Sequence, residues 1–249
     1  MPPRKKSKKN TSKTGDDTYS QESYWSKRYA VGDSAGEDKV EERDHDWYFS
    51  GEELQPLLDP LIDSIIDSES PNTILEIGCG MKPILTCLNF DPDSTLNLIS
   101  LDYSPPCITH LQSSFKSKKS KKYTFEVADA KNLKYEDNSI PIVIEKGTLD
   151  AIITSGVSNA VKVLSEMSRV TSRYLLVVTH FNLETEEGQE WMEDVLEPSL
   201  NVEDDGVFWK VNCNVGEGGG AMVIICEKCV RRETRNKGGA RMQIKVTEY

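Results

Sequence analysis

Short apolar runs alternate with longer amphipathic stretches through the middle of the chain. Five of these runs are rich in β-branched and aromatic residues, and each predicts a buried strand. They are residues 73–77, 96–101, 123–127, 140–144 and 174–178. The intervening stretches 83–89, 105–115 and 157–170 are long enough to form helices. Strands that alternate with helices predict a parallel sheet covered on both faces, which is a doubly wound α/β fold.

The two ends of this pattern add a helix and a hairpin. Apolar residues recur at helical spacing over 51–66, and Ser50 with Glu53 three residues later predicts a capping box at the start of that helix. Near the other end, the apolar runs 207–213 and 221–226 flank a glycine-rich segment. Two such runs joined by a short loop predict an antiparallel hairpin that closes the sheet.

Composition divides the chain into a single domain with two tails. Residues 1–20 are polar and lack periodicity, so we expect a disordered basic tail, followed by a domain over 21–230 and a C-terminal tail over 231–249. Residues 1–13 carry a charge of +6, which leaves −17 on the rest of a chain whose net charge is −11. An acidic body repels phosphate and attracts basic partners, so a nucleic-acid substrate is disfavoured.

Neither a membrane segment nor a metal site is expected. No apolar run approaches eighteen residues, and the basic N-terminus lacks the apolar stretch of a signal peptide. The six cysteines are irregularly spaced, and the Cys226–Cys229 pair lacks a second pair or suitably spaced histidines for zinc, so we expect two thiols on or just past an edge strand. The sequence therefore predicts a cytoplasmic protein, with the nucleus as a further location, and reduced thiols.

Polar residues follow successive predicted strands. Glu76, Gly78 and Gly80 end the first strand, where glycines let the backbone turn and approach a ligand. Asp102 ends the second strand, as an acceptor for a ribose diol would, and Asp129 follows the third. Because the carboxyl ends of parallel strands meet at one sheet edge, this set predicts a nucleotide-type cofactor site there.

The order E-x-G-x-G, then D-Y, then A-D-A resembles the class I, seven-stranded S-adenosylmethionine-dependent methyltransferases. Four segments are similar to one branch of the protein-lysine methyltransferases, which includes enzymes that act on elongation factor 1-alpha and on citrate synthase. They are Tyr24–Tyr29, Asp46–Phe49, Leu101–Ser104 and Glu145–Ala151. The resemblance runs from about Tyr24 to about Thr179 and implies a seven-stranded, mostly parallel sheet with a C-terminal antiparallel hairpin.

The resemblance also implies roles for individual residues. Trp25, Tyr29 and Trp47 would form an N-terminal aromatic lid over S-adenosylmethionine, with Gly78 at its methionine moiety and Asp102 at its ribose. The adenine would lie between Tyr103 and the Asp129–Ala130 pair, with Lys146 beside the cofactor. The complete implied set is Trp25, Tyr29, Trp47, Glu76, Gly78, Gly80, Asp102, Tyr103, Asp129, Ala130 and Lys146.

The fourth predicted strand ends in Glu145 and Lys146, where nucleic-acid amino-methyltransferases of this fold carry an Asn/Asp-Pro-Pro element. A protein substrate with an exposed lysine is therefore expected, with elongation factor 1-alpha as the first candidate and a monomeric enzyme. Lysine is a nucleophile only when neutral, so a carboxylate that orients the incoming ammonium would help. Glu145 is the first candidate for that role and Asp150 the second, since Asp150 can instead cap a helix.

Three other functions are compatible with these patterns. A small-molecule methyltransferase would need an enclosed pocket, whereas an open acidic rim would favour a basic protein. A catalytically silent relative that acts as a binding module would show degraded cofactor residues, and here they are intact. A nicotinamide-dependent oxidoreductase is disfavoured because Pro83 stands where the third glycine of G-x-G-x-x-G belongs and because a terminal hairpin is expected.

Overall fold

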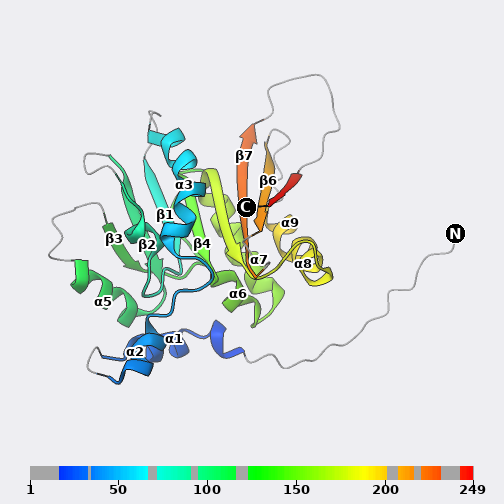
Figure 1. Ribbon diagram of the computed structural model, residues 1–249. Helices are drawn as coiled ribbons and strands as arrows, with labels where there is room; N and C mark the ends of the chain where they lie inside the picture. Colours follow the sequence, from blue (N-terminus) through cyan, green and yellow to red (C-terminus); the bar gives the residue numbers. More distant parts are fainter. Residues whose placement is uncertain are drawn as a thin grey trace, which may run out of the picture.

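The computed structural model describes residues 17–32, 35–66, 72–90, 95–115, 123–200, 207–215, 220–230 and 242–248. These residues build one mixed sheet with helices on both faces (Figure 1). The strands are β1 (Thr73–Ile77), β2 (Asn97–Asp102), β3 (Tyr123–Val127), β4 (Ile140–Lys146), β5 (Thr171–Thr179), β6 (Val207–Val215), β7 (Met222–Val230) and β8 (Met242–Glu248). Their order across the sheet is β3-β2-β1-β4-β5-β7-β6-β8.

The first five strands are parallel, and β7 runs antiparallel to both β5 and β6. The predicted doubly wound, mostly parallel sheet with an antiparallel C-terminal hairpin is therefore confirmed. Successive strands add outward on opposite sides of the β1–β4 pair. This is the switch point at which open α/β sheets form a crevice beyond the carboxyl ends of their strands.

Two apolar layers hold the helices against the sheet. On one face, α3 (Gly51–Ile66) and α4 (Ile84–Cys87) share a core with the buried Ile74, Ile142 and Leu176, and α5 (Pro105–Phe115) packs against β3. On the other, α7 (Val157–Val170) packs with Leu75, Val143 and Leu175. That face also carries α6 (Thr148–Ile153), α8 (Glu186–Trp191), the π-helical turn η2 (Met192–Leu196) and α9 (Glu197–Ser199).

The N-terminal segment contributes no strand in its described part and lies across the carboxyl ends of β1, β2 and β4. It contains a 3₁₀ turn η1 (Asp17–Ser20) and the helices α1 (Glu22–Tyr29) and α2 (Glu37–Arg43). Figure 1 shows α1 and α2, in blue, below the lower edge of the sheet. The capping box predicted before α3 is present, because the Ser50 amide donates to the Glu53 carboxylate at 2.7 Å and the Glu53 amide to Ser50 Oγ at 3.2 Å.

Three predictions need correction. The expected tail 231–249 contains β8, which pairs with β6 and gives the sheet an eighth strand. The last four residues of the expected tail 1–20 form η1 (Asp17–Ser20), while the basic run 1–13 lies outside the described residues. Cys226 and Cys229 lie on β7, an interior strand between β5 and β6 rather than an edge strand, and both are free thiols. No helix in the described ranges is long and apolar enough to cross a membrane.

Candidate cofactor and methyl-transfer site

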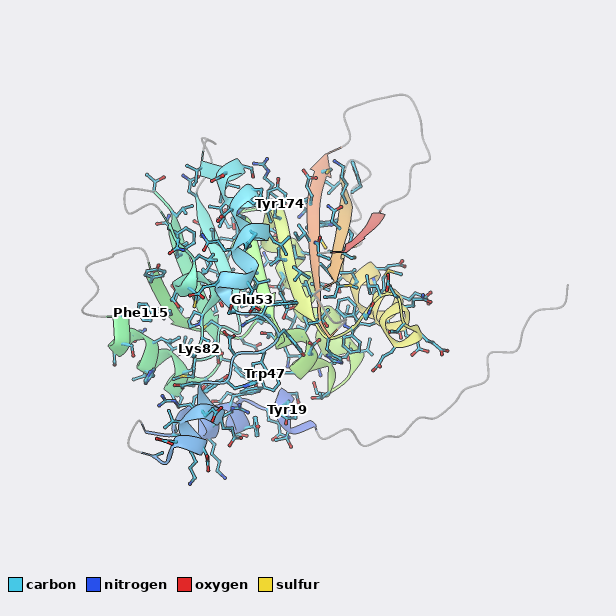
Figure 2. All side chains as sticks on the ribbon, viewed as in Figure 1. Tyr19, Trp47, Glu53, Lys82, Phe115 and Tyr174 are labelled. Carbon is cyan, nitrogen blue, oxygen red and sulfur yellow. The ribbon has the colours of Figure 1, made fainter. Side chains whose placement is uncertain are left out.

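A cavity of about 580 Å³ opens at the switch point, between the sheet edge and the N-terminal segment. Its size falls within the range of about 300–1,000 Å³ that is typical of sites for small molecules and cofactors. Figure 2 labels three residues of its lining: Trp47 and Lys82 lie between the N-terminal helices and the lower edge of the sheet, and Tyr19 lies on the N-terminal segment beside those helices. Every residue predicted for the site except Glu145 lines this cavity.

The loop after β1 forms the floor of the cavity. Gly78 and Gly80 have φ angles of +64° and +54°, the left-handed region that favours glycine. A Cβ on Gly78 would lie 2.0 Å from Thr148 Oγ1, so the first turn of α6 approaches the loop as closely as a glycine permits. The backbone of the loop is therefore open to a ligand on one side and packed against α6 on the other.

The buried Glu76 side chain fixes this loop through hydrogen bonds to its neighbours. The side chain is only 2 % exposed, and its carboxylate accepts hydrogen bonds from the Ile84 amide at 2.7 Å and from Ser100 Oγ at 2.8 Å. Burial raises the pKa of Glu76 to about 7, against the opposing effect of these hydrogen bonds. Glu76 thus ties β1 to the start of α4 and to β2, and shapes the cavity through the loop.

Asp102 presents acceptor capacity to the cavity. Its carboxylate accepts from the Gly80 amide at 3.1 Å and from the Ser104 amide at 2.9 Å, each through a different oxygen. The Tyr103 amide is a third backbone donor to this carboxylate, so one of its four acceptor positions remains for a ligand hydroxyl. Burial raises the pKa of Asp102 to about 6. The carboxylate is therefore mostly ionised at pH 7 and suited to accept a hydrogen bond from a ligand hydroxyl.

The N-terminal segment covers the cavity with aromatic rings. Trp25 and Tyr29 stack with their centroids 5.6 Å apart, and Trp25 Nε1 donates to the Tyr19 carbonyl at 2.6 Å. Trp47 lines the cavity and stays 36 % exposed. Aromatic faces suit both an adenine ring and a sulfonium cation.

Polar contacts attach this aromatic cover to the sheet edge. Lys146 forms an ion pair with Asp46 and donates to the Phe49 carbonyl at 2.7 Å, while Ser26 Oγ lies 3.0 Å from Ser104 Oγ. The charge of Lys146 is thereby compensated by a neighbour on the N-terminal segment. The contacts link α1 and the loop before α3 to the ends of β2 and β4.

Residues after β2 and β3 complete the opposite wall. Tyr103, Asp129 and Ala130 line the cavity, and Asp129 Oδ1 accepts from the Lys131 amide at 2.9 Å. Two buried thiols lie near Asp102, with their sulfur atoms within 4.8 Å of one of its oxygens: Cys79, which lines the cavity, and Cys107, which does not. Burial raises the pKa of Cys79, so this group stays a neutral thiol that packs as a small apolar side chain.

Glu145 lies near the end of β4, as the sequence analysis placed it, but it does not line the cavity. It is fully buried, and its Oε2 accepts from the amides of Thr148 at 2.9 Å and Leu149 at 3.1 Å. Its side chain therefore caps the first turn of α6, and burial raises its pKa well above the usual range.

Asp150, the second candidate, lines the cavity and is the centre of a polar cluster. Its Oδ2 accepts from Tyr48 Oη at 2.7 Å and from the His180 amide at 3.1 Å, while its Oδ1 accepts from Thr179 Oγ1 at 2.6 Å. The sequence analysis gave no role to His180 or Tyr48, although Tyr48 lies within the segment Asp46–Phe49 and His180 follows the strand that ends at Thr179. Histidine directly after a strand was the available signal for His180.

Comparison with known proteins agrees with this geometry. A family model described as a methyltransferase domain matches residues 68–215. Citrate synthase-lysine N-methyltransferase of Pongo abelii is 31 % identical over 137 residues, which is 50 % of this chain and 57 % of that protein. EEF1A lysine methyltransferase 4 of Mus musculus is 28 % identical over 162 residues, which is 61 % of this chain and 57 % of that protein.

The chain spans just over half the length of these curated relatives. Among solved structures, the [4+2]-cyclase SpnF superposes with a TM-score of 0.51 at 14 % identity, covering 74 % of this chain and 86 % of that one, which shows a shared fold. The residues of the cavity fit S-adenosylmethionine: a glycine floor, an ionised acceptor at Asp102 and an aromatic cover. The chain belongs to the family described as a methyltransferase domain.

Proposed function

We propose that this chain is an S-adenosylmethionine-dependent methyltransferase that acts on protein lysine, and that its substrate is a basic protein such as elongation factor 1-alpha. The observation that carries the proposal is the similarity to two relatives that are both named as lysine methyltransferases, one for citrate synthase and one for EEF1A. The segment Glu145–Ala151, which resembles the same branch, also supports the proposal. It provides both the carboxylate that caps α6 and the cavity-lining Asp150.

The charge around the cavity supports a basic partner. Residues 181–200, which follow directly after His180, contain seven acidic residues and no basic one. Glu186, Glu187 and Glu190 of α8 are all exposed. A surface of this kind lowers the free energy of a lysine- or arginine-rich segment near the cavity and raises that of a polynucleotide.

The bound cofactor supplies a methyl group activated by a positively charged sulfur. In the proposed arrangement Asp102 holds a ribose hydroxyl, Asp129 and Ala130 meet the adenine, and Trp25 and Tyr29 exclude water from the sulfonium side. The protein then has to receive a lysine side chain opposite the methyl group and hold it in line. We further propose a monomeric enzyme of the cytoplasm, with the nucleus as a second location.

The proposal is tested with the full-length protein, radiolabelled S-adenosylmethionine and a lysate from cells that lack the protein. Labelled proteins are hydrolysed in acid and the amino acids separated. We expect label in methylated lysine and in a small number of protein bands. Asp102→Ala is the matched control, because it should abolish cofactor binding without altering the acidic surface of α8.

Each other outcome supports a different function. Label in the low-molecular-weight fraction would favour a small-molecule methyltransferase, and label in arginine or in a base-labile ester would contradict the lysine assignment. Binding of the cofactor in calorimetry with no transfer to any lysate component would favour a non-catalytic interaction module.

A further inference from the structure

Four side chains from three parts of the chain meet beside the cavity. Asp150 comes from the first turn of α6, Thr179 ends β5, His180 follows it, and Tyr48 comes from the loop before α3. The carboxylate of Asp150 is the common partner of the other three, and its side chain is only 8 % exposed. The methyltransferase assignment gives no role to Tyr48 or His180, although both line the cavity.

The position of Asp150 fixes the proton on the His180 ring. His180 Nδ1 lies 3.2 Å from Asp150 Oδ2, so in the neutral ring the Nδ1–H donates to the carboxylate and the lone pair resides on Nε2. The His180 backbone amide binds the same oxygen, which holds the residue in place from two sides. The ring remains 46 % exposed, so a proton that it accepts can pass to solvent.

Tyr48 adds an acceptor beside this ring. Its hydroxyl donates to Asp150, which leaves the oxygen lone pairs for an approaching amine. Tyr48 has a φ angle of +62°, which is in the left-handed region and is strained for a non-glycine residue. Strain held at a cavity-lining residue is a recurrent feature of functional sites.

Negative charge surrounds His180. Asp150 on α6 and Glu187 on α8 both face it, and the hydrogen bond to Asp150 is the main reason that the pKa of His180 is raised above its ordinary value, against the opposing effect of burial. Burial, together with Asp150, also raises the pKa of Tyr48, so that its hydroxyl stays protonated. The same charges attract a lysine ammonium to this end of the cavity.

We propose that His180 is a catalytic base that accepts the proton of the substrate ammonium, with Asp150 as its positioning residue and Tyr48 as an acceptor that holds the amine. This rests on the proposed lysine specificity. The ammonium N–H bond breaks, its electron pair stays on nitrogen and its proton goes to His180 Nε2. The neutral nitrogen then forms a bond to the methyl carbon as the S–C bond breaks and its electron pair passes to sulfur.

The test is the pH dependence of the rate, measured as methyllysine formed in proteins of the lysate described above at concentrations below saturation. With a histidine base, the reacting form is neutral His180 with a protonated lysine of pKa about 10.4, so the wild-type rate should change less than twofold between pH 8.5 and 9.5. His180→Gln can use only the neutral amine. Its rate should fall about 100-fold at pH 8.5 and rise about tenfold over the same interval.

Matched variants separate catalysis from structure. His110→Gln on α5, outside the cavity, should keep the wild-type rate and profile. Asp150→Asn should give the steep profile of His180→Gln, and Tyr48→Phe should raise KM with the flat profile retained. A His180→Gln variant that keeps the flat profile, whether its rate is lowered or unchanged, overturns the inference. Cofactor affinity measured by calorimetry should be the same in all four variants.

A separate readout distinguishes this inference from the lysine assignment. Nitrogen NMR of the protein with S-adenosylhomocysteine should show neutral His180 at pH 8.5 as the Nδ1–H tautomer. An Nε2–H tautomer overturns the inference even if lysine is the methylated residue. Absence of methyllysine with wild-type protein, by contrast, overturns the proposed function whatever the tautomer of His180.

Discussion

Replacing Gly78 by alanine tests whether the contact with α6 limits the size of the residue in the loop after β1, which we call the cofactor loop. The new methyl group would lie 2.0 Å from Thr148 Oγ1, 2.8 Å from its Cγ2 and 2.9 Å from its Cβ. All three atoms of a β-branched side chain are involved, so no rotamer of Thr148 relieves the contact. The φ angle of +64° adds a backbone cost of about 1–2 kcal/mol.

Overpacking of this kind typically costs a further ~1–3 kcal/mol, so we expect Gly78→Ala to lose about 2–5 kcal/mol of unfolding free energy. Gly80→Ala is the matched control. Its φ angle is +54°, but the new Cβ would meet only Tyr29 Oη, at 3.1 Å, and that atom is the end of a side chain. The control should therefore lose only the backbone cost of about 1–2 kcal/mol.

A double-mutant cycle isolates the clash. Thr148→Ala removes the two atoms at 2.0 and 2.8 Å and also a hydrogen bond to the Ile77 carbonyl, so alone it should cost about 1 kcal/mol. The double variant should lose about 1–3 kcal/mol less unfolding free energy than the sum of the losses in the two single variants. Urea unfolding with an unchanged m-value measures each term. Additive costs would refute the idea that α6 limits the size of the residue at position 78.

Three further outcomes follow from the site. Asp102→Ala should abolish S-adenosylmethionine binding in calorimetry, and normal affinity would contradict the ribose role. Glu76 has a folded pKa of about 7 against about 4.3 unfolded, so its contribution to stability is full below pH 4 and is lost as pH rises through 7. The unfolding free energy of wild type should therefore fall by about 2–3 kcal/mol relative to Glu76→Gln between pH 5 and 9, and a constant difference would refute the shift. A Cβ on Gly188 would lie 1.8 Å from the Asn182 carbonyl, so Gly188→Ala should unfold at markedly lower urea than Gly36→Ala, which meets nothing within 4 Å; equal midpoints would contradict this contact.

The fold was predictable because its central strands β1 and β4 are buried on both faces. The strands 73–77 and 123–127 and the helices 51–66, 105–115 and 157–170 have the predicted bounds. An apolar run marks the first strand, and helical spacing marks the helices. The final strand was missed although Met242, Ile244 and Val246 alternate with polar residues, which is the pattern of a half-buried strand. The pattern was short and followed a polar segment.

The site was predicted correctly for residues whose position along a strand determines whether they line the cavity. It was not predicted for residues where the direction of the side chain determines this. Glu145 and Lys146 are adjacent at the end of β4, and successive side chains of a strand point to opposite faces. Lys146 reaches the cavity and Glu145 the core, a distinction that sequence alone does not provide. Tyr48 and His180 meet beside Asp150, which is more than a hundred residues from the first and thirty from the second.

The first turn of α6 has a consequence for how such an enzyme can change its substrate. Thr148 touches the cofactor loop, and Asp150, two residues later, holds the polar cluster. In the proposed reaction, the distance between the methyl donor and the lysine amine is thus set by the covalent structure of one short helix. The surfaces that would select a partner, the loop of Tyr48 and the acidic α8, lie on segments far away in sequence. They can diversify while the interatomic distance needed for methyl transfer is inherited unchanged.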